Sequence, residues 1–519
     1  MSSEIRRSEI ELDPTVHVSS AFVRSAPSGN QQIGNFPSHP RWYVRAALEV
    51  GLVKKTSRKQ DLLSLGLVSK IFLHPALDIL WKRINGIGPV LSVLPETTMV
   101  NGQKMFLQPI DPSSWDRLNF YTSRVREFDD WEPREGSKEA VHCSVYSYLG
   151  TQKPIFRNLR TLRISTSHLR SSDSFALFLA TTLWEVSWPR YLEWLPEDDP
   201  MHDLGDSLAA LVSNVPALKS LTLQDYNYSG LSVSLSCLLA LEGLDVLSLS
   251  RLEKGFIRAI AALPKLINLA LSLRGGVLDY GGVESGFPSL KELIIEGSAL
   301  DLNKFFDATR PKELQELTIE WEYQDVGNPP LAAFAAITPL FTSFPFLRSL
   351  TITKSSTSFQ DLDEVHLWLI FEPLLGLKSL VYLHFDIPLP LSDQNTARIS
   401  CAWPHLEELF LTATDDLPSL ESLMHFARNS ANLKDLSYPI QTCTALQSMI
   451  QIPPTISLHP LNRFYCNVMA EIAHAPAIAL GLFQIFPDIV QVVGIGPGWG
   501  QVQEILQLFI FLQEQNRGR

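Results

Sequence analysis

The hexapeptides LKELII, at residues 290–295, and LQELTI, at residues 314–319, decide the fold of this chain. Each has an apolar residue at its first, fourth and sixth positions. This L-x-x-L-x-L spacing forms the centre of leucine-rich repeats, which recur with periods of roughly 20–29 residues. Thirteen copies occur, on average about 27 residues apart, and they begin at residues 159, 183, 218, 244, 266, 290, 314, 347, 377, 406, 433, 461 and 489. In the ninth copy, LKSLVYLHF, the leucines at 377, 380 and 383 are alternative anchors.

The second half of each copy predicts a short β-strand, because alternating apolar residues give a strand one buried face. Between copies the apolar spacing becomes that of a helix, as in FIRAIAAL at 256–263, LAAFAAITPLF at 331–341 and LESLMHFA at 420–427. Strands and helices that alternate with right-handed crossovers stack into a solenoid. The sequence therefore predicts an α/β leucine-rich-repeat solenoid with a parallel β inner face and outer helices.

A dense apolar stretch near the N-terminus, QDLLSLGLVSKIFLHPALDILWKRI at residues 60–84, has a different pattern. Asp61 is suited to cap a first short helix, and Pro75 to start a second one. Two short amphipathic helices do not make a stable core alone. We therefore expect a small all-α head ahead of the solenoid, which packs on a further helix, on the solenoid or on a partner.

The composition limits the partners and the compartment. The 519 residues carry a formal net charge of −12, which disfavours nucleic acid and anionic membranes because both require clustered Lys and Arg. The N-terminal MSSEIRRSEIELDP lacks the apolar core of a signal peptide, and polar residues interrupt the apolar run at 472–496. Five cysteines without C-x-x-C spacing indicate reduced thiols and no zinc site. We expect an intracellular protein of the cytoplasm, the nucleus or both.

Motifs for catalysis or cofactor binding are missing from the sequence. No G-x-x-x-x-G-K-[ST] phosphate loop, H-E-x-x-H or G-x-S-x-G motif occurs. The glycine-rich GIGPGWG at 494–500 lacks the lysine and the spacing of a nucleotide loop, so we interpret it as a turn that ends the array. The acidic residues between 193 and 206 lack EF-hand spacing and are expected in a solvated loop. The sequence predicts no enzyme, no cofactor and no metal.

The residues between the apolar anchors are expected to point away from the core, onto the concave face of the solenoid. Four of them, on two neighbouring predicted strands, are acidic: Glu292, Glu296, Glu316 and Glu320. Such a patch would attract a basic segment of another protein. Aromatic side chains anchor interfaces, so later strands are expected to continue this target-binding site. Their residues are Tyr382, His384, Asp386, Glu408 and Phe410. Alternatively, all of these are only solvated outer positions of an acidic protein.

The stretch LLSLGLVSKIFLHPALDILWKRI at 62–84 resembles the second and third helices of the F-box. LQPIDPSSWDRLNFYTSRVREF at 107–128 resembles the connector of the F-box/leucine-rich-repeat proteins common in mushroom-forming fungi. The resemblance covers about residues 60–500. It implies a substrate-recognition subunit of a cullin-RING (SCF-type) ubiquitin ligase, whose F-box binds a Skp-type adaptor while the solenoid holds the protein to be ubiquitinated. The matching positions, which would bind the adaptor, are Leu62, Leu63, Leu67, Val68, Leu77, Leu80 and Trp81.

The first F-box helix is atypical in this chain. The family begins its F-box with Leu-Pro, an acidic residue and an apolar helix, whereas HPRWYVRAALEVGLVKKTSRKQ stands here at 39–60. The alternative function is therefore a protein-binding leucine-rich-repeat scaffold that no longer binds the adaptor. The expected divisions are a disordered tail at 1–39, an F-box-like helical head at 40–95, a connector at 96–158, about thirteen repeats at 159–494 and a C-terminal capping helix at 495–519.

Overall fold

The structure is a computed structural model of the whole chain. It describes residues 57–517 except for 131–139, 152–153, 165–174, 189–203, 225–229, 249–251, 274–280, 282, 284–285, 322–340, 342, 355–363, 415–416, 442–458, 470–471 and 473. The chain divides into two compact units, Met1–Ala76 and Leu77–Arg519. The predicted tail at 1–39, and most of the stretch in place of the first F-box helix, lie outside the described residues.

The described part of the first unit contains α2 (Ser57–Val68) and most of α3 (Lys70–Leu80), which form the predicted pair of short helices. The two helices meet at small side chains: Ala76 is 1% exposed, and a Cβ added at Gly66 would lie 3.5 Å from the Cβ of Ala76. Both helices start earlier than predicted. The first starts at Ser57, so Asp61 lies inside α2 and does not cap it, and the second starts at Lys70, so Pro75 lies inside α3. A proline there removes one hydrogen bond from the helix.

Fifteen strands of the second unit form one sheet, in which every neighbouring pair is parallel and the strand order follows the chain. They are β1 (Arg83–Asn85), β4 (Glu127–Asp130), β6 (Thr161–Ile164), β7 (Glu185–Trp188), β8 (Ser220–Gln224), β9 (Gly243–Ser248), β10 (Asn268–Ser272), β11 (Glu292–Gly297), β12 (Glu316–Trp321), β13 (Ser349–Lys354), β14 (Tyr382–Leu389), β15 (Glu408–Ala413), β16 (Asp435–Ser437), β17 (Arg463–Met469) and β18 (Gln491–Ile495). The predicted leucine-rich-repeat fold is confirmed.

The thirteen strands from β6 to β18 coincide with the thirteen copies of the repeat. β1 and β4 extend the same sheet by two strands ahead of Leu159, where the sequence analysis predicted none. Ile84 is the buried centre of β1, and Phe128 is the one buried residue of β4. A strand with a single buried residue has no alternation to detect.

The register of the sheet shows that one copy was placed three residues too late. Leu244 pairs with Leu221 on β8 and with Leu269 on β10, and both of these are second anchors. Leu244 is therefore the second anchor of the copy LEGLDV at 241–246, and not the first anchor of LDVLSL. Leu241 and Val246 are fully buried, as the corrected frame requires. The sequence alone did not decide, because leucines occupy the first and fourth positions in both frames.

The ninth copy, for which three leucines were possible anchors, also has a definite register. Leu383 pairs with Leu350 on β13 and with Leu409 on β15, so it is the second anchor. The first and third anchors of this copy are Leu380 and Phe385, and all three side chains are buried.

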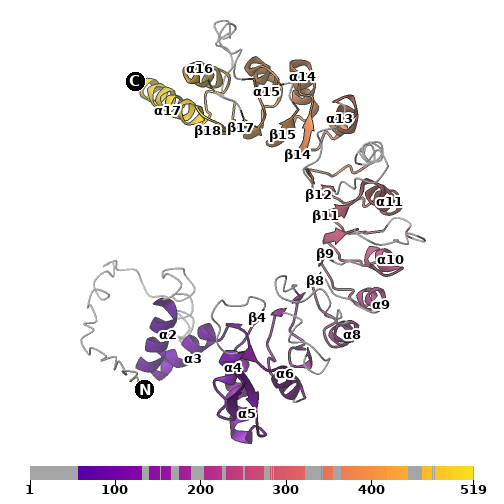
Figure 1. The fold of residues 1–519 in the computed structure, drawn as a ribbon, viewed down its shortest axis with the longest axis vertical. Helices are drawn as coiled ribbons and strands as arrows, with labels where there is room; N and C mark the ends of the chain where they lie inside the picture. Colours follow the sequence, from indigo (N-terminus) through magenta and orange to yellow (C-terminus); the bar gives the residue numbers. More distant parts are fainter. Residues whose placement is uncertain are drawn as a thin grey trace, which may run out of the picture. The chain divides into compact units, whose positions relative to one another are not determined.

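Helices cover one side of this sheet (Figure 1). They include α8 (Gly205–Asn214), α9 (Leu231–Ser236), α10 (Phe256–Ala261), α11 (Ala299–Thr309), α13 (Glu364–Phe371), η3 (Glu372–Gly376), α14 (Asp393–Ala402), η4 (Leu420–Ser422), α15 (Leu423–Asn429) and α16 (Ala475–Ile485). The predicted helices at 256–263 and 420–427 are found as α10 and as η4 with α15. The one predicted at 331–341 lies almost wholly outside the described residues.

α11 shows how a helix is fixed between two strands. The Ser298 hydroxyl caps it by accepting the N–H of Asp301 at 3.3 Å, and Leu302, Phe305 and Phe306 are buried. Arg310 ends the helix with a φ of 39°, in the left-handed region. Apolar side chains of helices and strands join in one continuous core from Ile84 to Leu506.

A small second sheet lies between β1 and β6 in the sequence. β2 (Thr97–Val100) and β3 (Gln103–Phe106) form an antiparallel hairpin, and β5 (Ala140–Val141) pairs parallel with β3. Asn101 and Gly102 both have positive φ, which is typical of a type I′ hairpin turn. The helices of this region are α4 (Gly88–Leu91), α5 (Pro112–Thr122) and α6 (Cys143–Gly150).

The sheet ends at β18, whose outer edge is covered by α17 (Trp499–Arg517). The Gln503 side chain accepts the N–H of Val492 and donates to the carbonyl of Val490 at 3.2 Å. Gln507 donates to the same carbonyl at 2.9 Å. The glutamine amides thus replace the next strand and satisfy backbone groups that would otherwise form an exposed edge. The GIGPGWG segment contains the end of β18, the turn at residues 496–498 and the start of α17.

Candidate functional site

The open face of the sheet, by which we mean the side that carries no helices in Figure 1, is formed by the residues between the apolar anchors. β11 shows the alternation: Glu292 and Ile294 are exposed, whereas Leu293 and Ile295 are buried. The same pattern holds on β12 and β13. The predicted orientation of these residues is therefore found in the structure, while their role in binding stays a prediction.

The four predicted glutamates come together on β11 and β12. Glu292 is the register partner of Glu316, and Glu296 that of Glu320. Neighbouring strands are about 4.8 Å apart, so the four glutamates form two cross-strand pairs, which we together call the acidic patch. Like charges directly opposite each other on a sheet are unfavourable.

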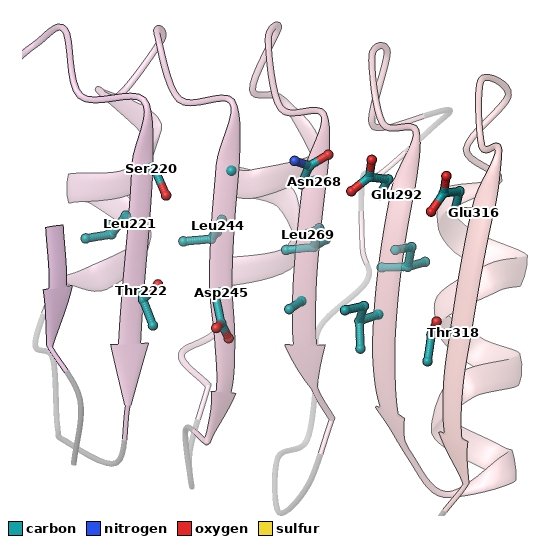
Figure 2. A pocket seen from close by; sticks show the side chains of 14 residues that line it. Ser220, Leu221, Thr222, Leu244, Asp245, Asn268, Leu269, Glu292, Glu316 and Thr318 are labelled. Atoms are coloured by element: carbon teal, nitrogen blue, oxygen red, sulfur yellow. The ribbon is translucent and has the colours of Figure 1, made fainter. Parts of the chain in front are cut away.

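A hollow of about 280 Å³ extends across the open face from β8 to β12 (Figure 2). Its first row of residues runs Ser220, Gly243, Asn268, Glu292 and Glu316, and its second row runs Thr222, Asp245, Ala270, Ile294 and Thr318. The hollow forms where both rows have their smallest side chains, at Gly243 and Ala270. A Cβ added at Gly243 would have only the Ser220 Oγ within 4 Å, at 3.8 Å.

Asp245 projects from β9 among these residues (Figure 2). Its Oδ1 accepts the N–H of Leu247 at 3.2 Å. Burial raises the pKa of this carboxyl, and the Leu247 N–H opposes that shift. The sequence analysis missed Asp245 because the wrong frame of this copy placed its neighbour Val246 on the open face.

Predicted residues also meet on β14 and β15. The Phe410 ring lies 5.8 Å from the Tyr382 ring and 5.5 Å from the His384 ring. Burial, together with the charge of Glu408, raises the pKa of Tyr382. These three rings with Glu408 form what we call the aromatic cluster. Asp386 lies farther along β14 and is half-buried.

The seven residues predicted to bind an adaptor divide between the two units. In the first unit Leu63, Leu67 and Val68 are exposed, the last two to 86% and 78%, and Leu62 is half-buried. Ile71, which was not predicted, is exposed beside them in sequence. In the second unit Leu77, Leu80 and Trp81 are half-buried.

Trp81 has a structural partner within the second unit. Its ring lies 4.7 Å from the ring of Tyr121 and packs against the core. Of the predicted adaptor residues, the exposed ones on α2 are therefore better placed for an external contact than Trp81.

Other kinds of site find no support in the described ranges. Within them, no group of three or more His, Cys, Asp or Glu side chains could hold a metal ion. Among the same residues, no helix has the length and apolar character needed to cross a membrane. Of the described cysteines, Cys237 and Cys401 are exposed and Cys466 is buried.

Comparison with known proteins gives a likeness in fold. No family model matches the sequence, and no curated protein matches it significantly. Among solved structures, the leucine-rich-repeat protein LegL7 from Legionella pneumophila is 14% identical, with 70% of this chain and 94% of that chain covered and a TM-score of 0.29. A chain of the yeast Rad7–Elc1 complex is 15% identical, with 68% and 77% covered and a TM-score of 0.33.

A leucine-rich-repeat protein from Leptospira interrogans is 14% identical, with 77% of this chain and 74% of that chain covered and a TM-score of 0.30. At such identities the likeness concerns the fold alone. The function has to be argued from the residues of this chain.

Proposed function

We propose that this chain is a non-enzymatic substrate adaptor of an SCF-type ubiquitin ligase, which captures a target protein on the open face of its repeat sheet. The observation that carries the proposal is that the acidic patch and the aromatic cluster lie on the same face, separated only by β13 with its Ser349, Thr351 and Thr353. A surface that offers both charge and aromatic anchors is suited to a polypeptide with basic and apolar side chains.

The exposed apolar residues of α2 support the ligase part of the proposal. Leu63, Leu67 and Val68 have exposed side chains on α2, and the sequence of this helix resembles that of an F-box helix. Exposed apolar side chains that cluster mark interaction surfaces more often than isolated ones do. The competing function is a protein-binding scaffold that has no adaptor contact, since the first F-box helix is atypical.

The test is one affinity purification of the full chain in the presence of a recombinant Skp-type adaptor, with two variants. In the first variant, Leu67→Glu and Val68→Glu place charges on the α2 surface. We expect adaptor binding to be lost while the thermal melt is unchanged, because both side chains are largely exposed. The control is Val233→Glu on α9, where the valine is 72% exposed. If the unmodified chain retains no adaptor, the scaffold function holds instead.

In the second variant, Glu292, Glu296, Glu316 and Glu320 are all changed to Lys. We expect capture of a basic partner to be lost, because the charge of the patch is inverted, while adaptor binding and the melt persist. The matched control reverses four exposed carboxylates elsewhere, at 206, 313, 504 and 514. Mass spectrometry of the bound proteins is the measurement. An unchanged set of bound proteins would show that the acidic patch does not capture the target.

A further inference from the structure

We infer that the hollow across β8–β12 is a recess for one basic side chain of an extended target segment, and that Asp245 is its charge-recognising residue. This inference rests on the proposed function, since it names what the open face holds. It adds Asp245 to the residues that would bind the target, and it places the basic side chain in the hollow next to the acidic patch.

The size of the hollow indicates a side chain and not a whole small molecule. Small-molecule sites usually enclose roughly 300–1,000 Å³, whereas this hollow measures about 280 Å³ and lies open on a sheet face. Its space exists because Gly243 has no side chain and Ala270 ends at Cβ. An unbranched side chain that lies flat across the strands would fill such a gap.

The chemistry of the lining indicates a cation with an apolar stem. Ile294 is 39% exposed and forms, with Ala270, an apolar wall beside the carboxylate of Asp245. Glu292 and Glu316 lie at the other row of the same hollow. Lysine and arginine combine an apolar stem with a charged end. The stem would contact Ala270 and Ile294, and the charged end would contact Asp245.

Asp245 itself is arranged to hold such a charge. The Leu247 N–H fixes one carboxylate oxygen at 3.2 Å and leaves the other without a protein donor in the described part of the chain. The carboxylate has no ion pair with any described residue, and its cross-strand neighbours Thr222 and Ala270 are uncharged. A partly buried carboxylate with an open oxygen gains more from an incoming cation than a fully solvated one does.

The test uses random twelve-residue peptides displayed on phage and selected against the full-length chain. We expect the enriched peptides to share a Lys or Arg. Synthetic copies are then measured by isothermal titration. Asp245→Asn should weaken their binding roughly ten- to a hundredfold, the loss typical of a hydrogen bond to a charged group. Asparagine keeps an oxygen for the Leu247 N–H, so the fold should be retained. Replacing the shared basic residue by Gln should cause the same loss.

Two further variants separate shape from charge. Ala270→Leu fills the hollow without altering any charge and should weaken binding as much as Asp245→Asn does. Asp307→Asn removes an exposed carboxylate on α11, which pairs with Arg310 at 2.8 Å, and should change affinity less than twofold. Circular dichroism melts check that each variant is folded.

The outcomes distinguish this inference from the proposed function. Suppose that Phe410→Ala weakens binding of the selected peptides, but that they share no basic residue and their affinity does not change with Asp245→Asn. This result would overturn the recess and leave target capture by the open face standing. A selection that yields no peptide dependent on Asp245, Ala270 or Phe410 would overturn both.

Discussion

Two glycines near the C-terminus, Gly494 in β18 and Gly500 in α17, differ in what a methyl group added to each would contact. A Cβ on Gly494 would lie 2.2 Å from Cε2 of Trp499, whose indole is 3% exposed and packs on the glycine. A Cβ on Gly500, in the first turn of α17, would have nothing within 4 Å. The same substitution should therefore have opposite effects at positions only six residues apart.

We predict that Gly494→Ala destabilises the C-terminal cap by about 1–3 kcal/mol, the usual cost of overpacking a core. Gly500→Ala should be neutral or stabilise by up to about 1 kcal/mol, because alanine is the better helix former. Hydrogen exchange over residues 490–517, together with the thermal melt, measures both. Equal effects of the two substitutions would show that the indole does not need the glycine.

Asp245 shows where residue-level prediction from this sequence ends. The glutamates of the acidic patch were placed correctly because LKELII and LQELTI each allow one frame only. LEGLDVLSL allows two, and only the burial of Leu241 and the pairing of Leu244 decide between them. A shift of three residues in a strand moves side chains to the opposite face, so the most enclosed carboxylate of the hollow was not among the predicted residues.

Strands that bury several alternating residues could be predicted from the sequence, whereas a strand that buries only one residue could not. β11 and β12 each bury three residues in alternation, whereas β1 buries only Ile84. A capping helix after β18 was predicted, at 495–519, whereas the way in which it covers the strand edge was not. It depends on Gln503 meeting the backbone of Val490 and Val492, and glutamine on a helix is ordinarily a solvated residue.

His459 joins two elements, the end of α15 and the start of the copy at 461. Its Nε2–H donates to the carbonyl of Ser430, the C-cap of α15, at 2.8 Å. Its Nδ1 accepts the N–H of Leu461 at 3.2 Å, which requires the neutral ring. Burial lowers the pKa of His459, with the carbonyls of Ser430 and Phe426 opposing the shift.

We predict from this that acid weakens the α15–β17 junction. The unfolded chain takes up a proton on this ring at about pH 6.5, whereas the folded chain resists it. His459 therefore leaves the free energy of unfolding unaffected above about pH 6.5 and lowers it below that pH, by at most about 1.4 kcal/mol per pH unit.

Urea denaturation between about pH 5 and 7.5 measures the free energy of unfolding against pH. Its slope should be shallower for His459→Gln than for the unmodified chain. His405→Gln, at an exposed histidine, serves as the control and should keep the slope. Identical slopes in all three proteins would contradict the prediction.

At the scale of the whole molecule, the sheet makes a repeated local contact into a long surface. Each strand pairs only with its chain neighbours, so the face can differ from one strand to the next without disturbing the core. This separation explains why the anchors could be predicted while the recess could not: the anchors repeat along the chain, whereas Gly243, Asp245 and Ala270 are not part of the repeating pattern. Two electrostatic effects therefore have different sources. The net charge of −12 acts at long range, and the recess acts only on a side chain in contact with it.

We predict that these two sources separate in the kinetics of a selected basic peptide. The net charge of −12 acts over distance, so the on-rate should fall about tenfold or more as NaCl rises from roughly 0.05 to 0.5 M. The contact with Asp245 is short and partly buried and is screened less, so the off-rate should change little with salt. Asp245→Asn should raise the off-rate and leave most of the salt dependence of the on-rate. Surface plasmon resonance at several salt concentrations measures both rates. An off-rate that follows salt while the on-rate stays constant would mean that the charge of the molecule holds the peptide and does not guide it.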